Sequence, residues 1–171
     1  HATAGGVGLI ACQWLKAIGA TVIGTVGSHE KAELAKANGC DHTILYKEEN
    51  FADRVKEITN GDGVPVVYDS VGKDTALQSL DCLSPLGLLV LFGNSSGNAP
   101  AIEPGLLATK GSLYVTRPTL FNYNDTREKL MESANQVFNM IRNGKVSIKI
   151  GAKYELKNAV QAHKDLESRK T

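Results

Sequence analysis

Short apolar runs alternate with stretches of helical periodicity, and this alternation constrains the fold more than any other feature of the sequence. The runs that we expect to form strands span residues 21–26, 43–46, 64–68, 87–92, 113–116 and 146–150. Helices are expected at 8–18, 30–38, 51–58, 74–83, 125–143 and 156–168. Strands that are apolar on both faces and are joined through helices predict a parallel sheet covered on both sides, which is the doubly wound α/β class.

The composition is that of one globular domain. The chain has 171 residues, of which 42% are hydrophobic and 22% charged, so it is long enough to bury a sizeable core. Its 19 basic and 18 acidic residues leave a formal charge of +1, which gives no reason to expect nucleic acid or an acidic membrane as a partner. No apolar run approaches the ~18 residues that a membrane-spanning helix needs.

The three cysteines, Cys12, Cys40 and Cys82, are odd in number and far apart in the sequence. No C-x-x-C pair and no histidine at ligand spacing accompanies them. We therefore predict neither a metal site nor a disulfide framework, and expect reduced thiols in a cytoplasmic protein.

The chemical centre of the sequence is the glycine cluster at residues 3–8, directly before the first predicted helix. In the dinucleotide fingerprint G-x-G-x-x-G, Gly5 and Gly8 match the second and third glycines, while Thr3 replaces the first. Gly5 would let the backbone approach a pyrophosphate, and Gly8 would let the helix pack closely on the sheet. The free N–H groups at the helix start would receive the phosphate charge. The alternative, for the cluster taken alone, is a tight turn that binds nothing.

The loop after the 21–26 run indicates which dinucleotide is bound. NAD-specific sites carry Asp or Glu there to hold the ribose 2′-hydroxyl. In this chain Gly27 stands at that place, and Ser28 and Lys31 supply a hydrogen-bond donor and a positive charge for a 2′-phosphate. The expected cofactor is therefore NADPH. The alternative is that Lys31 is merely solvated and that Glu30 serves NAD.

Six segments, in order and across essentially the whole chain, resemble the zinc-independent quinone oxidoreductases of the medium-chain dehydrogenase/reductase superfamily, which include zeta-crystallin. They are HATAGGVGLIACQ at 1–13, IGTVG at 23–27, VYDSVG at 67–72, LFGNSSG at 91–97, KGSLYVTRP at 110–118, and AH followed by LESR within 162–169. The likeness is greatest to bacterial NADPH:quinone oxidoreductases.

The resemblance implies a set of NADPH-binding residues. The pyrophosphate would be met by Gly5, Gly6 and Val7, and the adenosine 2′-phosphate would be surrounded by Gly27, Ser28, Lys31 and Tyr46. Beside the adenosine half would lie Ser70 and Val71. Near the nicotinamide would lie Phe92, Gly93, Asn94, Ser95, Pro118 and Thr119, and a further contact to the cofactor would come from Arg169. Several have plainer alternatives. Tyr46 and Phe92 could serve packing alone, Asn94 and Ser95 could be turn formers, and Arg169 could be solvated.

The resemblance also implies that residues 1–171 are the NADP(H)-binding Rossmann-like domain of a larger subunit. Only His1 and Ala2 precede the glycine cluster, so the first strand and the catalytic domain are expected to be missing. Unpaired backbone groups at such a gap predict a marginally stable chain, or another segment that fills the gap.

The reaction implied for the full-length enzyme is hydride transfer from NADPH to a quinone or a related electron-poor alkene, without zinc. We assign no catalytic residue and no metal ligand in this chain, and expect it to be inactive alone. A homodimer through the Lys110–Thr116 edge strand is implied as well. The alternatives are a non-catalytic NADPH-binding protein of the crystallin type and an RNA-binding protein, which the near-neutral charge disfavours.

Overall fold

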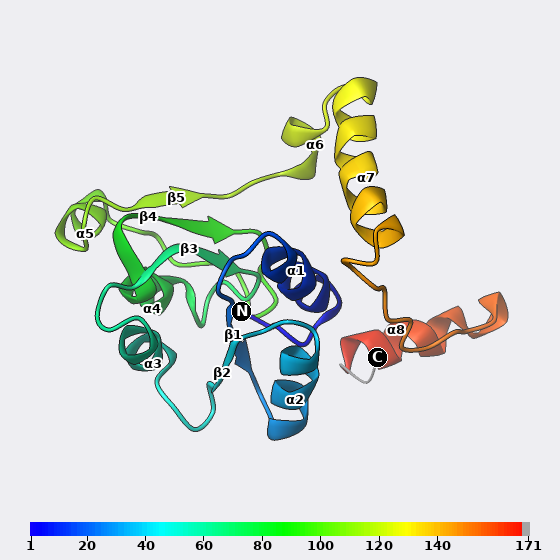
Figure 1. The fold of residues 1–171 in the computed structure, drawn as a ribbon, viewed down its shortest axis with the longest axis horizontal. Coiled ribbons are helices and arrows are strands. Elements are labelled where there is room, and N and C mark those ends of the chain that lie inside the picture. Colours follow the sequence, from blue (N-terminus) through cyan, green and yellow to red (C-terminus); the bar gives the residue numbers. More distant parts are fainter. Residues whose placement is uncertain (169–171) are drawn as a thin grey trace.

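The computed structural model describes residues 1–168 and contains two parallel sheets flanked by helices (Figure 1). In the first sheet β1 (Ile23–Val26) pairs with β2 (His42–Leu45). The second contains β3 (Val64–Asp69), β4 (Leu83–Leu91) and β5 (Tyr114–Thr116) in that order. The predicted α/β class with parallel strands is confirmed.

The first residues of the chain lie between the two sheets. The amino group of His1 donates to the Tyr68 carbonyl oxygen on β3 over 2.8 Å, and the Thr3 N–H donates to the Thr25 carbonyl oxygen on β1 over 3.2 Å. Within residues 1–168 no strand lies between β1 and β3, as the sequence predicts. From this gap the strands follow one another outward in opposite directions, β1 then β2 on one side and β3, β4 and β5 on the other. Doubly wound sheets bind their ligands at such switch points.

The helices begin where the sequence provides capping residues. Ser28 accepts a hydrogen bond from the N–H of Lys31, and Asn50 accepts from those of Ala52 and Asp53, as capping residues commonly do. The described helices are α1 (Gly6–Ala17), α2 (His29–Ala37), α3 (Phe51–Ile58), α4 (Ala76–Ser79), η1 (Leu80–Cys82), α5 (Pro104–Thr109), α6 (Leu120–Tyr123), α7 (Arg127–Arg142), η2 (Leu156–Asn158) and α8 (Ala159–Glu167).

Three buried clusters form the core. The first lies between α1, β1 and α2, and the second covers β4 and the segments next to it. The third joins the two sheets, because Phe51 and Val55 of α3 pack with Ile44 of β2 and with Val64 and Val67 of β3. Helix α3 thus holds β1–β2 and β3–β4–β5 as one body despite the gap between them.

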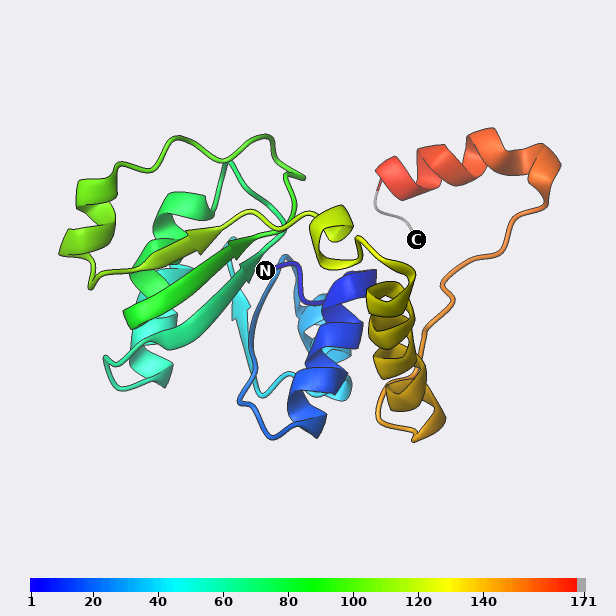
Figure 2. The ribbon, with the colours of Figure 1, turned by 90° about the horizontal axis from the view of Figure 1, so that it is seen from above.

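The C-terminal third extends away from this body. Beyond β5 an extended segment leads to α6 and α7, and α8 lies apart from both sheets (Figures 1 and 2). The turn after α7 returns to α1, where the Gln13 side chain accepts from the Ser147 N–H over 2.8 Å. No helix among residues 1–168 has the length and apolarity needed to cross a bilayer.

Several predicted elements differ from the structure. The strand predicted at 146–150 is wrong: Val146 is buried, but the following residues are exposed and have no strand beside them. The helix predicted from residue 74 begins only at Ala76, because the preceding turn is held by the side chain of Asp69. The short helices α5 and α6 were not predicted at all.

Candidate functional site

The glycine loop opens α1 with unbonded backbone donors. The N–H groups of Gly6, Val7 and Gly8 find no acceptor in the described part of the chain, and the first turn of the helix contains no acidic residue. A Cβ atom on Gly8 would lie 2.5 Å from the carbonyl oxygens of both Ala2 and Thr3, so only glycine fits there. At Gly6 such an atom would meet nothing within 4 Å. The loop is therefore open toward solvent, and its free donors suit an anion.

Thr3 occupies the position where the fingerprint has its first glycine. Its side chain is buried, and its hydroxyl donates to the Thr25 carbonyl oxygen over 3.2 Å. A Cβ on Gly24 would lie 2.4 Å from the Thr3 oxygen, so the space that Thr3 needs comes from a glycine on β1. The departure from the fingerprint is thus accommodated without disturbing the loop.

The four residues predicted to surround the 2′-phosphate gather where β1 and β2 end. Tyr46 donates its N–H to the Val26 carbonyl oxygen over 3.2 Å, and its phenol oxygen lies 2.8 Å from where a Cβ of Gly27 would stand. Ser28 caps α2 as an acceptor, which leaves its own O–H free to donate. Lys31 is exposed in the first turn of α2 and forms no ion pair with residues 1–168.

A buried carboxylate organises the loop that follows β3. Asp69 is fully buried, and its Oδ1 accepts from the N–H groups of Val71 and Gly72 at 2.8 and 3.0 Å. Its Oδ2 accepts from the hydroxyls of Thr75 and Ser79 at 2.7 and 3.0 Å. The sequence interpretation assigned Asp69 no role of its own, although an acid directly after an apolar strand was the available signal.

The loop after β3 and the loop after β4 form one unit. The N–H of Ser95 donates to the Ser70 carbonyl oxygen over 3.1 Å, and that of Ser96 to the Val71 carbonyl oxygen over 2.9 Å. A Cβ on Gly93 would lie 2.6 Å from the same Ser70 oxygen, so glycine permits this approach. Four of the predicted residues, Ser70, Val71, Gly93 and Ser95, are therefore brought together, and Phe92 joins them through its N–H to the Asp69 carbonyl oxygen.

A pocket of about 280 Å³ connects these loops with the glycine loop. Of the predicted residues, Gly5, Gly6, Val7, Ser70 and Phe92 line it. The other lining residues are His1, Ala2, Thr3, Gly8, Ala11, Cys12, Val22, Ile23 and Tyr68. The pocket thus lies at the switch point between β1 and β3, and its lining includes the residues with free N–H groups, Gly6, Val7 and Gly8, as well as Tyr68 and Phe92.

The remaining predicted residues lie outside this pocket. The Asn94 side chain bonds Asn98 over 3.1 Å, as a turn former would. Pro118 and Thr119 follow β5, where the Arg117 guanidinium donates to the Leu91 carbonyl oxygen over 3.0 Å and so holds the segment near the end of β4. The Thr119 hydroxyl bonds the Asn122 side chain. Arg169 lies outside the described residues.

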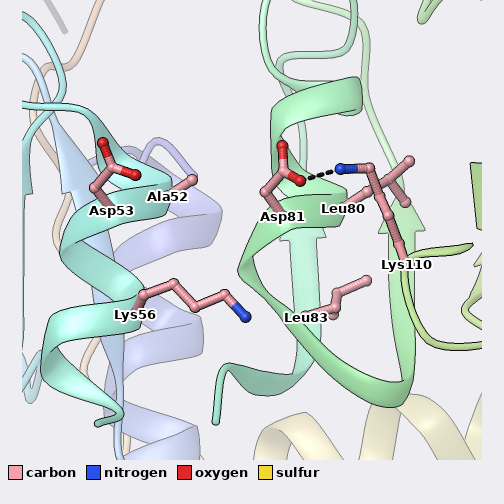
Figure 3. Close-up of a pocket in the computed structure, with 7 residues that line it drawn as sticks. All are labelled: Ala52, Asp53, Lys56, Leu80, Asp81, Leu83 and Lys110. Carbon is pink, nitrogen blue, oxygen red and sulfur yellow. Dashed lines mark hydrogen bonds and ion pairs between the residues drawn. The ribbon is translucent and has the colours of Figure 1, made fainter. Parts of the chain in front are cut away.

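A second pocket, of about 380 Å³, lies between α3 and η1 (Figure 3). Leu83, the first residue of β4, forms part of its wall, and Lys110 pairs there with Asp81. The other lining residues are Ala52, Asp53, Lys56 and Leu80. Parallel sheets bind ligands at the carboxyl ends of their strands, so the pocket beside the glycine loop is the better candidate.

The described residues contain no group of three or more His, Cys, Asp or Glu side chains that could hold a metal ion. That zinc takes no part in the reaction stays a prediction.

The family model described as zinc-binding dehydrogenase matches residues 6–136. A quinone oxidoreductase of Pseudomonas aeruginosa is 55% identical over the whole chain, which corresponds to 53% of that protein. A 2-haloacrylate reductase of a Burkholderia species is 45% identical over the whole chain and 52% of its own length. The crystal structure of Escherichia coli quinone oxidoreductase complexed with NADPH superposes with a TM-score of 0.94 at 55% identity, covering all of this chain and 53% of that one.

The chain thus spans about half the length of the relatives that it matches. The family match covers well over half of this chain, and the superposition extends over all of it. The resemblance seen in the sequence is confirmed, and the chain belongs to the zinc-binding dehydrogenase family.

Proposed function

We propose that residues 1–171 form an NADP(H)-binding Rossmann-like domain and that the glycine loop holds the pyrophosphate of NADPH. The observation that carries the proposal is the start of α1, where three neighbouring N–H groups are free and border the pocket at the switch point. At Gly6 a Cβ atom would meet nothing within 4 Å, so a phosphate has room to approach the backbone there, while the missing Cβ of Gly8 serves the close packing of α1. Gly5, Gly6 and Val7 would make these contacts.

Selectivity for NADPH over NADH is assigned to the group formed by Gly27, Ser28, Lys31 and Tyr46. The Ser28 hydroxyl and the Lys31 ammonium would bind the 2′-phosphate, and the start of α2 adds the positive end of a helix dipole. No carboxylate stands at position 27 to hold a ribose hydroxyl in its place. Tyr46 lies over Gly27 and would border the adenosine end.

The adenosine half is assigned to the loop after β3, and the nicotinamide end to the loop after β4 and the segment after β5. Beside the adenosine half would lie Ser70 and Val71. Near the nicotinamide would lie Phe92, Gly93, Asn94, Ser95, Pro118 and Thr119, with Arg169 as a further contact to the cofactor. The hydrogen bonds between the two loops support this assignment, because they hold backbone groups at fixed positions beside the pocket. When bound, the nicotinamide supplies a hydride, and these residues set its position.

For the full-length protein we propose reduction of a quinone or a related electron-poor alkene. The names of the relatives support this class, since the P. aeruginosa protein is a quinone oxidoreductase and the Burkholderia protein reduces a 2-haloacrylate. Both substrates carry a carbon–carbon double bond that is polarised by an electron-withdrawing group. None of the residues of this chain is assigned as an acid or base for that step.

A homodimer through the Lys110–Thr116 segment is part of the proposal. Strand β5 is outermost in the order β3-β4-β5, and Tyr114 is 60% exposed while Leu113 is buried. An edge strand of this kind can pair with its copy across a two-fold axis. Sedimentation of the full-length protein as a monomer at micromolar concentration would rule this interface out. A cytoplasmic location remains a prediction.

A titration of the Lys31→Ala variant tests the assignment of the phosphate end. Loss of one charged hydrogen bond should weaken NADPH binding about tenfold and leave NADH binding unchanged. Lys36→Ala is the matched control, because Lys36 lies in the last turn of the same helix and pairs with Glu33. Equal losses for both nucleotides, or the same loss in the control, would contradict the assignment.

A further inference from the structure

A serine side chain joins the loops that follow β3 and β4, and it is not among the residues assigned to the cofactor. Ser96 is half-buried, whereas its neighbours Asn94 and Ser95 are exposed. Its hydroxyl donates to the Val71 carbonyl oxygen over 2.9 Å and accepts from the Asp74 N–H over 3.1 Å. The hydroxyl therefore uses both its donor and its acceptor capacity on the loop after β3.

The two loops are held in place by different means. The loop after β3 is fixed by the buried carboxylate of Asp69, which accepts from the N–H groups of Val71 and Gly72 at 2.8 and 3.0 Å. The loop after β4 is positioned against that first loop, because the N–H and the hydroxyl of Ser96 both donate to the Val71 carbonyl oxygen. Asp69 thus sets the first loop, and Ser96 sets the second loop relative to it.

Backbone contacts beyond Ser96 keep the loops together. The N–H of Lys73 donates to the Gly97 carbonyl oxygen over 3.0 Å. A Cβ on Gly72, which has a φ of +89°, would lie 2.6 Å from the same Gly97 oxygen, so a glycine is needed for this approach. These contacts do not involve the Ser96 hydroxyl. Its removal should therefore shift the second loop without unfolding it.

We propose that Ser96 is a positioning residue that sets the place of residues 92–95, the segment assigned to the nicotinamide. The inference rests on the proposed function. Ser96 acts through the backbone of the loop and needs no contact with the cofactor. Loss of its hydroxyl should weaken the hold on the nicotinamide ring. The phosphate contacts should be unchanged, because they are assigned to the starts of α1 and α2.

Titration with two ligands tests the proposal. NADPH and 2′-phospho-ADP-ribose share the adenosine, the 2′-phosphate and the pyrophosphate, but only NADPH has a nicotinamide. In Ser96→Ala we expect NADPH binding to weaken about fivefold, as for the loss of a hydrogen bond, and the binding of 2′-phospho-ADP-ribose to stay the same. Calorimetry measures both dissociation constants. Equal losses for the two ligands, or no loss for either, would overturn the proposal.

Ser84→Ala is the matched control. Ser84 is also half-buried, and its hydroxyl joins the start of β4 to the start of β3 by donating to the Val64 carbonyl oxygen over 3.3 Å. The same kind of hydrogen bond is removed there, at the strand ends away from the candidate cofactor pocket. The control should bind both ligands as the unmodified chain does. A loss of NADPH binding as large as that of Ser96→Ala would overturn the role assigned to Ser96.

Amide hydrogen exchange of the free chain tests the order of the two loops without any ligand. In Ser96→Ala the amides of Ser95 and Ser96 should exchange faster, while those of Val71 and Gly72 keep the protection that Asp69 gives them. Equal acceleration in both loops, or none in either, would overturn the proposal. If neither ligand binds the unmodified chain although the exchange behaves as expected, the proposed function is contradicted and the role toward the nicotinamide falls with it.

Discussion

At the scale of single residues, the buried carboxylate of Asp69 is tolerated because four hydrogen-bond donors surround it. Two of these donors are backbone N–H groups of the loop that carries Val71, and two are hydroxyls near α4. The imidazole of His1 extends the network, since its two nitrogens lie 2.9 Å from the hydroxyl oxygens of Thr25 and Ser79. One side chain thereby holds the loop that borders the candidate cofactor pocket.

Replacing Asp69 with Ala should therefore destabilise the chain strongly. Four donors, two of them fully buried and two half-buried, would lose their acceptor, and we expect the free energy of unfolding to fall by about 3 kcal/mol or more. Asp69→Asn should cost less, because the amide oxygen can still accept from the N–H groups of Val71 and Gly72. Urea denaturation followed by circular dichroism measures both. Equal, small losses in the two variants would show that the network does not carry this role.

At the scale of elements, α1 depends on a close approach that only glycine permits. Gly8→Ala would place a methyl group 2.5 Å from two backbone carbonyl oxygens, so the helix start must shift. We expect a loss of about 1–3 kcal/mol in the free energy of unfolding, together with loss of NADPH binding. Gly105→Ala in α5 is the control, because nothing lies within 4 Å of its added methyl group. A neutral Gly8→Ala variant would contradict the packing described for α1.

The pairing of β1 with β2 is assisted by an ion pair that should respond to pH. The Lys16 ammonium lowers the pKa of Asp41, whose carboxylate also accepts from the N–H of Val22 over 2.9 Å. Because the pKa of Asp41 is lower in the folded chain than in the unfolded chain, its ionised carboxylate stabilises the fold. This stabilisation is fully present when the pH is above the unfolded-state pKa of about 3.9, and it is lost as the pH falls through the folded-state pKa.

Asp41→Asn keeps the hydrogen bond to Val22 and removes the charge. Because the pair is exposed, the variant should be less stable than the unmodified chain by at most about 1 kcal/mol at neutral pH. The difference should shrink as the pH falls below the unfolded value and vanish once the pH is below the folded pKa of Asp41, where both chains are neutral at this position. Urea denaturation of both chains across this pH range measures it, and a difference that grows on acidification would contradict the assignment.

At the scale of the whole molecule, local patterns predicted the fold well, and contacts between distant segments were missed. The glycine loop and the parallel sheets follow from short motifs and apolar runs, whereas the place of Tyr46 beside Gly27 was implied only by the family resemblance. The strand at 146–150 was wrong because an apolar, β-branched segment becomes a strand only if a neighbouring strand offers an edge. The hydroxyls that bind Asp69 depend on tertiary packing, which no local pattern reveals.

An NMR titration of the labelled chain with NADPH tests the central claim most directly. The account predicts that the amide signals of Gly6, Val7 and Gly8 shift first and most, because their free N–H groups would receive the pyrophosphate. Signals at Ser28 and Lys31 should shift with NADPH and much less with NADH. Shifts confined to the pocket of Lys56 and Lys110, or no shift at the start of α1, would contradict the account.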